Sequence, residues 1–415
     1  MRIVYLNPCA RWGGAETSLQ QFLASLRKAE PSWELWLVLG EDGPFAGAAR
    51  ALGVRVMVEP IPGSLRRLGD SGGGKAPWRM LGAALASATY ARRLASRLAE
   101  IRPAIIHSNG FKMHVLGAWA RPRGARLVWH IHDYVSSRPM MSRLLRFFGK
   151  ACDLAVANSE SVAADVGRVL GGTPVMRIYN AVDTERFSPN GKKLDLDALS
   201  GLAPADPETV RVGLVATFAR WKGHKVFLDA LARLAPQLNV RAYVIGGPIY
   251  QTEGSQWTME ELRQEVDRLA LTGRVGFTGF LEDTPAAMRS LDIVVHASTE
   301  PEPFGMVIIE AMACGRAVVA SRAGGAGELL AGNERALSHE PGDAAGLARE
   351  ISRLADDDNL RRRLAEAGRS AAERMFDSKR LAKELVAAYA RVCGEATEGF
   401  STAFRVDPQL ESQTK

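Results

Sequence analysis

The sequence predicts an α/β protein with two domains, and three observations support this. Short apolar runs rich in β-branched residues alternate with amphipathic segments along the chain, a pattern typical of parallel strands and crossover helices. The chain has 415 residues and 47% hydrophobic content, which is enough to bury two cores of about 200 residues each. Residues 188–209, rich in proline and aspartate, separate the halves and are predicted to be a linker.

In the first half, the apolar runs predict the following strands: 2–7, 35–39, 54–58, 104–108, a strand within 127–134, 154–157 and 175–178. Amphipathic segments predict helices at 17–27, 45–52, 80–100 and 112–120. Residues 62–77 are too rich in glycine and charge to pack into a core, so we expect a mobile loop there. It is either a surface insertion or a loop that contacts an acceptor substrate or a membrane.

In the second half, strands are predicted at 210–216, 241–245, 275–278, 291–296 and 317–321. Helices are predicted at 224–234, 258–270, 306–314 and 378–392. A polar loop is expected at 249–257, and residues 396–415 are expected to form a loose tail.

The stretch from 299 to 315 carries the clearest chemical signal. Prolines around Glu302 disfavour a helix there, and Gly305 is a suitable start for a helix that carries Glu310. A strand, a loop and a helix in this order place the loop at the carboxyl edge of a sheet, where open α/β folds bind ligands. Backbone amides around Phe304, Gly305 and Met306 would bind an anion, while the two carboxylates would accept hydrogen bonds from neutral hydroxyls. Phosphate and diols together describe a sugar nucleotide.

The spacing Glu302-x7-Glu310 is followed by Gly315, by residues 318–321, and by the glycine pair and glutamate within 323–328. This arrangement resembles the donor-site signature of retaining glycosyltransferases of family 4, also called glycosyl transferases group 1. The resemblance extends from residue 1 to about 389. It implies the GT-B fold, in which two Rossmann-like, doubly wound domains face each other across a cleft.

The resemblance implies a domain layout: an acceptor-side domain at 1–187, the linker at 188–209 and a donor domain at 210–376. Residues 377–395 would form a terminal helix that packs back toward the first domain, before the tail at 396–415. The implied enzyme is hexosyltransferase-like. It transfers a sugar from a nucleotide-diphosphate sugar to an acceptor hydroxyl, with retention of configuration and without a metal or another cofactor, in surface polysaccharide or glycolipid synthesis.

Individual roles also follow from the resemblance. Glu302, with the backbone of Phe304 and Gly305, would bind the donor sugar, and Glu310 the ribose. Gly13 and Gly14 match a loop that faces the donor phosphates, although a simple tight turn explains their spacing equally well. His132 would contact the sugar or hold charge near the leaving group.

Lys222 matches the phosphate-binding lysine of the family, whereas Thr217 stands where its arginine is expected, and Arg220 is a possible substitute. Backbone near Gly246, Gly279 and Phe280 would face the nucleotide and its base. We therefore predict His132, Glu302 and Lys222 as catalytic residues, within a donor site that includes the other residues named.

Charge and cysteines narrow the function classes. Residues 1–190 carry 25 Lys and Arg against 14 Asp and Glu, a net +11, while the remainder carries 28 against 32, a net −4. The basic half favours an anionic membrane, a lipid-linked acceptor or an acidic glycan, and no motif supports nucleic-acid binding. Four separated cysteines and no long apolar run favour a cytoplasmic protein without disulfides or structural zinc. The basic half would place it at the inner face of the membrane.

The segment 138–150 has apolar residues at helical spacing with Arg143, Arg146 and Lys150 between them. Such a helix either lies on an anionic membrane or, as is more common, turns its apolar face to a core. Exposure of Phe147 and Phe148 would favour the membrane.

Three other functions remain open at this point. A sugar-nucleotide epimerase of the same fold would bind the same donor without an acceptor. A dehydrogenase is disfavoured because no Gly-x-Gly-x-x-Gly fingerprint is present. A non-catalytic sugar-nucleotide-binding protein is favoured only by the threonine at position 217.

Overall fold

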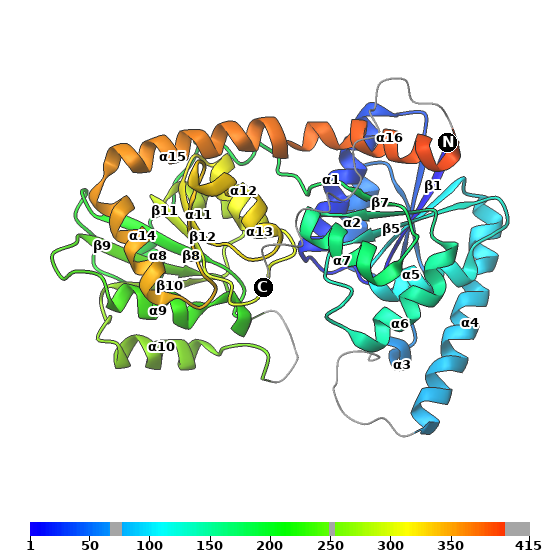
Figure 1. The fold of residues 1–415 in the computed structure, drawn as a ribbon, viewed down its shortest axis with the longest axis horizontal. Coiled ribbons are helices and arrows are strands. Elements are labelled where there is room, and N and C mark those ends of the chain that lie inside the picture. Colours follow the sequence, from blue (N-terminus) through cyan, green and yellow to red (C-terminus); the bar gives the residue numbers. More distant parts are fainter. Residues whose placement is uncertain (67–76, 249–253, 395–415) are drawn as a thin grey trace. The chain divides into compact units, whose positions relative to one another are not determined.

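The computed structural model describes residues 1–66, 77–248 and 254–394 (Figure 1). It divides into two compact units, one formed by Met1–Tyr179 with the segment that starts at Lys379, and the other by Asn180–Ser378. Most of the predicted loop at 62–77, part of the polar loop at 249–257 and the tail at 396–415 lie outside the described residues. Of the predicted loop, α3 (Gly63–Arg66) is described as a short helix.

In the described part of the first unit, seven parallel strands form one sheet in the order β3-β2-β1-β4-β5-β6-β7. The strands are β1 (Arg2–Asn7), β2 (Glu34–Leu39), β3 (Arg55–Val58), β4 (Ile105–Asn109), β5 (Arg126–Ile131), β6 (Leu154–Ala157) and β7 (Val175–Arg177). The central strands are almost wholly buried, as their continuous apolar runs predict. The predicted alternation of strands and helices is confirmed.

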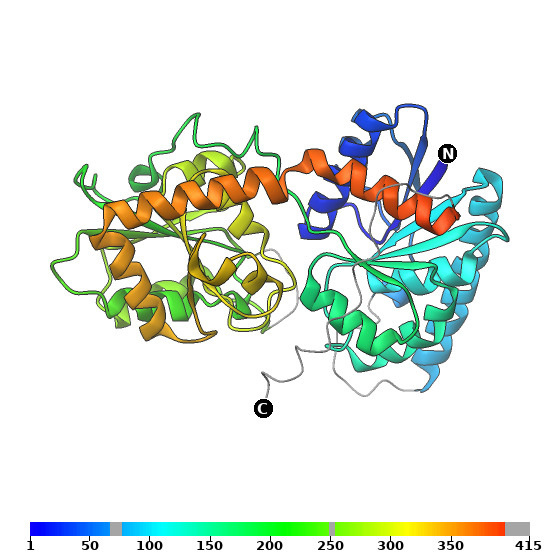
Figure 2. The same ribbon diagram turned by 45° about the horizontal axis from the view of Figure 1, so that its top comes forward.

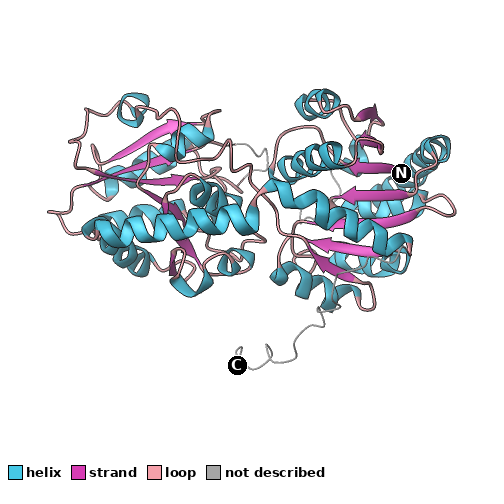
Figure 3. Cartoon of the chain, turned by 90° about the horizontal axis from the view of Figure 1, so that it is seen from above, coloured by secondary structure: helices cyan, strands magenta, loops and turns pink. Residues whose placement is uncertain are grey.

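The helices that cover this sheet are α1 (Gly14–Ala29), α2 (Pro44–Ala51), α4 (Pro77–Ile101), α5 (Phe111–Ala120), α6 (Pro139–Phe148), α7 (Glu160–Leu170) and α16 (Leu381–Cys393). Helix α5 packs against both α4 and α6, and α6 also contacts α7. Ser159 caps α7, because its side chain accepts a hydrogen bond from the amide of Val162. Helices cover the sheet, as Figure 3 shows.

Helix α16 returns to the first unit and packs on α1 (Figures 1 and 2). The hydroxyl of Tyr389 lies 2.8 Å from the hydroxyl of Tyr5 and 2.8 Å from Nδ1 of His107, all in the buried core. A buried hydroxyl without a partner would be costly. These hydrogen bonds therefore join α16 to β1 and β4.

In the second unit, six described strands form a parallel sheet in the order β10-β9-β8-β11-β12-β13. They are β8 (Val210–Val215), β9 (Val240–Ile245), β10 (Val275–Gly279), β11 (Ile293–His296), β12 (Ala317–Ser321) and β13 (Leu337–His339). The helices are α8 (Leu196–Ser200), α9 (His224–Ala232), α10 (Met259–Arg268), α11 (Thr284–Arg289), α12 (Met306–Ala313), α13 (Gly325–Glu328), α14 (Ala344–Asp356) and α15 (Asp358–Ala371). Two α/β units with parallel sheets agree with the predicted fold class.

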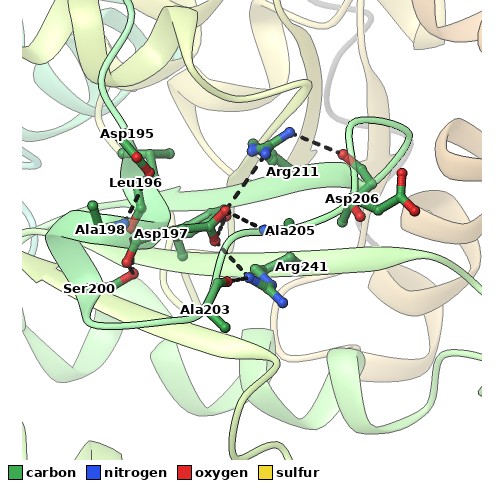
Figure 4. Close-up of polar contacts among 12 residues, drawn as sticks. Asp195, Leu196, Asp197, Ala198, Ser200, Ala203, Ala205, Asp206, Arg211 and Arg241 are labelled. Carbon is green, nitrogen blue, oxygen red and sulfur yellow. Dashed lines mark hydrogen bonds and ion pairs between the residues drawn. The ribbon is translucent and has the colours of Figure 1, made fainter.

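The predicted linker at 188–209 differs from the structure, because this segment belongs to the second unit. Its helix α8 carries the buried Asp197, which accepts hydrogen bonds from Arg241 at 2.9 Å and from the hydroxyl of Tyr243 at 2.7 Å. Arg211 forms a further ion pair with Asp197 at 3.7 Å (Figure 4). Proline and aspartate predicted a solvated linker, but the charge of Asp197 is matched by arginines on β8 and β9, which the local composition does not reveal.

Within the described residues, no helix is long and apolar enough to cross a membrane.

Candidate functional site

The predicted donor residues of the second unit follow neighbouring strands of its sheet. Gly246 follows β9, Gly279 ends β10, Lys222 lies beyond β8, and Glu302 lies beyond β11. Because all strands of this sheet are parallel, their carboxyl ends share one edge. The structure therefore brings these four predicted residues to one edge.

The loops after β8 and β11 are joined closely. The amide of Thr299 donates a hydrogen bond to the carbonyl oxygen of Trp221 at 2.8 Å. Gly223 has a φ of 75°, and a Cβ atom there would lie 1.8 Å from the carbonyl oxygen of Ala297. Only glycine permits this approach, which places Lys222 beside Glu302.

The central polar contact of the site is the ion pair between Lys222 and Glu302. The Lys222 ammonium lies 2.7 Å from Oε1 and 2.8 Å from Oε2 of the carboxylate. Burial by itself would raise the pKa of Glu302, but the charge of Lys222, followed by a hydrogen bond from His296, holds that pKa well below its usual range. The carboxylate is therefore ionised at neutral pH.

Two further partners of Glu302 were not predicted from the sequence. The hydroxyl of Ser298 donates to Oε2 at 2.8 Å, and Nε2 of His296 lies 3.2 Å from the same oxygen. Both side chains are buried. Their alternate spacing at the end of a buried strand is the signal that could have found them, since residues i and i+2 of an extended chain face the same side.

Glu310 lies on α12, as predicted, and its environment differs from that of Glu302. Burial raises the pKa of Glu310 to about 7, although the positive charge of Arg186 acts in the opposite direction. The two carboxylates of the motif therefore differ in charge state near neutral pH. Glu302 is an anion, whereas Glu310 gains and loses a proton in that range.

The turn before α12 positions the predicted anion site. Phe304 is buried against Phe376, with a ring separation of 6.2 Å. Gly305 has a φ of 100°, and a Cβ atom there would lie 2.9 Å from Ile308. This conformation favours glycine. It lets α12 begin at Met306, so its amino end lies at the same edge as Glu302.

Gly246 and Gly279 are in direct contact, because the amide of Gly246 donates to the carbonyl oxygen of Gly279 at 2.9 Å. Gly246 has a φ of 141°, and its missing Cβ would lie 1.9 Å from the carbonyl oxygen of Ala216. The neighbouring Phe280 is 72% exposed. An exposed aromatic ring beside this backbone fits the predicted base-facing position.

Arg220 is engaged away from the Lys222–Glu302 pair. Its guanidinium forms an ion pair with Glu261 at 3.0 Å and lies 3.8 Å from the centre of the Trp257 ring. The Oγ1 atom of Thr217 is buried and finds no hydrogen-bond partner among the described residues. In this conformation Arg220 does not occupy the place of the arginine expected at 217.

In the first unit, Gly13 precedes α1 and Gly14 is its first residue. Gly13 is extended, and a Cβ atom there would lie 2.9 Å from the carboxylate of Glu16. A Cβ at Gly14 would meet nothing within 4 Å. Glu16 in turn accepts a hydrogen bond from Asn7 at 3.0 Å. Space around Gly14 is compatible with the predicted ligand loop.

His132 follows β5 and contacts Asn109, with 3.3 Å between Nε2 and the amide oxygen. Burial lowers the pKa of His132 to about 4. The ring is therefore uncharged at neutral pH, so of its two predicted roles a hydrogen bond is favoured over carrying a positive charge. The neighbouring His130 is wholly buried and stacks on Phe22 at 4.7 Å, as expected for a core residue.

Helix α6 has one buried and one exposed apolar face. Leu145 is buried and Phe148 packs against the core. Met140, Leu144 and Phe147, spaced so that they share a face, are 50%, 41% and 74% exposed. The core-facing interpretation of this segment accounts for only one of its apolar faces.

No group of three or more His, Cys, Asp and Glu side chains within residues 1–66, 77–248 and 254–394 is arranged to hold a metal ion.

Comparison with known proteins places these features in a family. The family described as "Glycosyltransferase Family 4" matches residues 12–186, and "Glycosyl transferases group 1" matches residues 204–371. The lipopolysaccharide core biosynthesis glycosyltransferase LpsE of Rhizobium meliloti is 30% identical over 263 residues, which cover 62% of this chain and 70% of LpsE. N-acetyl-alpha-D-glucosaminyl L-malate synthase of Bacillus anthracis is 24% identical over 324 residues, 75% of this chain and 81% of that protein.

Among solved structures, HepE of Anabaena in complex with UDP matches 94% of this chain and 100% of its own, with 28% identity and a TM-score of 0.76. HepE has also been solved with UDP-glucose, and that structure matches with a TM-score of 0.75. The two family matches together span most of both units, and their order along the chain is that of the two sheets. The chain belongs to the family 4, group 1 glycosyltransferases of the GT-B fold, and it is a glycosyltransferase.

Proposed function

We propose that this glycosyltransferase moves a sugar from a nucleotide-diphosphate sugar to an acceptor hydroxyl, with retention of configuration and without a bound metal. The observation that carries the proposal is the grouping of Lys222, Glu302 and the amino end of α12 at one sheet edge. A cation and helix amides suit a leaving diphosphate, and a fixed carboxylate suits sugar hydroxyls. The match to HepE, solved with UDP and with UDP-glucose, supports this donor class.

Each part of the donor has a candidate partner in this chain. Lys222 and the backbone of Gly305 and Met306 would face the diphosphate, and Glu302 the sugar. Glu310 would accept hydrogen bonds from the ribose, and the backbone at Gly279 would face the base.

At the anomeric carbon the proposed reaction forms one bond and breaks one, and a proton moves between two oxygens. The acceptor oxygen bonds to the anomeric carbon on the face from which the diphosphate leaves, and the bond from that carbon to the phosphate oxygen breaks. The acceptor's proton passes to the departing phosphate. Lys222 would stabilise the negative charge that develops on the leaving group, which is the role a metal ion fills in other enzymes.

A thermal-shift panel tests the donor. The wild-type protein is heated with UDP, GDP, ADP and their common sugar conjugates, with and without EDTA, beside Glu310→Ala. A ligand that binds the folded state raises the melting temperature by mass action. We expect one nucleotide family to stabilise the wild type, equally in EDTA, and to stabilise the variant less. No shift with any nucleotide would contradict the donor assignment, and a shift abolished by EDTA would contradict metal independence.

The acceptor is proposed to be a glycan or a lipid-linked glycan in the synthesis of a surface polysaccharide or glycolipid. The name of LpsE, a lipopolysaccharide core enzyme, supports this class. Neither the epimerase nor the non-catalytic protein has a comparable observation in its favour. An acceptor screen with the donor chosen above tests the class, and turnover of the nucleotide sugar without any acceptor would instead favour the epimerase.

We also propose that the protein works in the cytoplasm, at the inner face of an anionic membrane, through α6. The stripe of Met140, Leu144 and Phe147 is exposed, and Arg143 and Lys150 beside it have no ion-pair partner among the described residues. Residues 101–150 contain nine Lys and Arg and one Asp. Apolar side chains flanked by basic side chains without ion-pair partners are suited to the boundary between acyl chains and acidic headgroups.

Vesicle flotation tests this surface. The wild type is expected to float with phosphatidylglycerol vesicles but not with phosphatidylcholine vesicles. The double variant Leu144→Ser, Phe147→Ser should bind the anionic vesicles roughly ten-fold more weakly, because it loses the apolar part of the contact. Leu199→Ser, which changes an exposed leucine of the second unit, is the control. Equal flotation with both lipids, or equal loss in the control, would contradict the proposal.

A further inference from the structure

The carboxylate of Glu302 has two kinds of hydrogen-bond partner. Lys222 reaches both oxygens, and its side chain is 19% exposed. Ser298 and His296 reach Oε2, and they are 1% and 3% exposed. A ligand that arrives from solvent can therefore displace the ammonium of Lys222, whereas the two buried partners are out of its reach.

The two buried partners are also bound to each other. Oγ of Ser298 lies 3.0 Å from Nε2 of His296 while its own proton points to Glu302. A carboxylate only accepts, and the serine oxygen has a free lone pair, so Nε2 of His296 carries a proton and donates to both. The backbone carbonyl of His296 lies 3.3 Å from Nε2 of the buried His339. Side chain and backbone of His296 are thus both held by buried neighbours.

The number of contacts sets a condition on donor binding. Each carboxylate oxygen has about two lone-pair sites. Oε2 of Glu302 receives hydrogen bonds from Lys222, Ser298 and His296, whereas Oε1 receives one from Lys222. Oε2 is therefore fully occupied, so a sugar hydroxyl has to donate to Oε1, and Lys222 must move for both sites on Oε1 to be open. The ammonium is the group that a diphosphate attracts. Movement of Lys222 would therefore supply a cation to the diphosphate and free the Glu302 carboxylate for the sugar.

We propose that the Lys222–Glu302 ion pair is opened by the donor, with Lys222 transferring to the diphosphate while His296 and Ser298 hold the Glu302 carboxylate in place for the sugar. His296 and Ser298 are then positioning residues, since they act on the sugar only through Glu302. This inference rests on the proposed function, in which Lys222 and Glu302 bind different parts of one donor.

The first test compares binding of UDP with binding of UDP-glucose by titration calorimetry. Ser298→Ala and His296→Leu should leave UDP affinity within about two-fold of the wild type and weaken UDP-glucose roughly ten-fold, the scale of one hydrogen bond to a charged group. His296→Gln, whose amide nitrogen can take the place of Nε2, should keep most of the wild-type affinity for UDP-glucose. Tyr243→Phe, which removes a buried hydroxyl bonded to Asp197 in the same unit, should leave the ratio of the two affinities unchanged.

The second test addresses the ion pair itself. Glu302→Gln keeps the shape of the side chain but removes the negative charge that Lys222 must leave. UDP should therefore bind several-fold more tightly to this variant than to the wild type. UDP-glucose should lose the part of its affinity that the contact between its sugar and Glu302 contributes. Damage to the site would instead weaken both ligands.

The outcomes separate this inference from the proposed function. If the wild type binds neither ligand, nor any pair in the thermal-shift panel, the donor assignment itself fails. If the wild type binds both, three results would overturn the inference. Ser298→Ala and His296→Leu could weaken the binding of UDP and UDP-glucose equally, or leave both affinities unchanged. Glu302→Gln could bind UDP more weakly than the wild type does.

Discussion

The carboxyl group of Glu310 titrates near neutral pH because burial raises its pKa to about 7. A ribose diol donates its hydrogen bonds, and an ionised carboxylate accepts them better than a protonated one. If Glu310 binds the ribose, the affinity for the nucleotide sugar must therefore depend on the charge of this single group.

We predict that the affinity for the nucleotide sugar rises by up to roughly ten-fold between pH 6 and pH 8. In Glu310→Gln, which cannot ionise, the affinity should be lower at pH 8 and nearly independent of pH. Calorimetry at matched ionic strength measures both, and an intact sugar conjugate avoids the titrating terminal phosphate of the free diphosphate. An equal pH dependence in the variant would show that another group titrates.

At the scale of elements, the approach of the loop before α9 to the end of β11 decides where Lys222 lies. The missing side chain of Gly223 permits this approach, since a Cβ atom there would overlap the carbonyl oxygen of Ala297. Gly201, at the end of α8, has a similar φ of 70° but has nothing within 4 Å of its Cβ position. A comparison of substitutions at Gly201 and Gly223 therefore separates the cost of a positive φ from the cost of the contact with Ala297.

We predict that Gly201→Ala lowers the free energy of unfolding by about 1 kcal/mol, the cost of a positive φ in alanine. Gly223→Ala should lower it by at least about 2 kcal/mol, because the backbone must also move, and it should weaken nucleotide-sugar binding. Urea unfolding and calorimetry measure the two effects. Equal losses of stability in the two variants would indicate that the contact with Ala297 is unimportant.

At the scale of the whole molecule, buried histidines couple stability to pH. Burial lowers the pKa of His107 to about 3 and those of His132 and His224 to about 4, against about 6.5 in an unfolded chain. Between these values the unfolded state binds more protons than the folded state, so stability falls as the pH falls. Glu310 acts in the opposite direction, because its raised pKa makes the folded state bind a proton between about 4.5 and 7.

The three histidines outweigh the single glutamate, so the melting temperature should fall steadily as the pH is lowered from 7 to 4.5. Each extra proton bound by the unfolded state contributes about 1.4 kcal/mol per pH unit. Circular dichroism melts at constant ionic strength measure this dependence, and recovery at pH 7 after exposure to pH 4.5 is the control for irreversible damage. A melting temperature that is flat or rises toward pH 4.5 would contradict the role of these histidines.

Much of the fold could be predicted from local patterns. The strand at 2–7 and the helix that carries Glu310 lie where their apolar residues and glycines place them. The segment 188–209 could not be predicted, because α8 is fixed by an ion pair between Asp197 and Arg241, which are 44 residues apart. The direction of Arg220 depends in the same way on Glu261, 41 residues along the chain.

The sequence by itself determined the α/β class, the order of the elements and the residue types of the donor motif, because periodicity, prolines and glycines act over a few neighbouring residues. Only the tertiary structure decided which charges meet. It pairs Lys222 with Glu302 across 80 residues, adds His296 and Ser298 to that carboxylate, and gives Glu302 and Glu310 different pKa values. The physical reason is that pKa and hydrogen bonding depend on burial and on distances of a few ångströms, which separation along a chain does not fix.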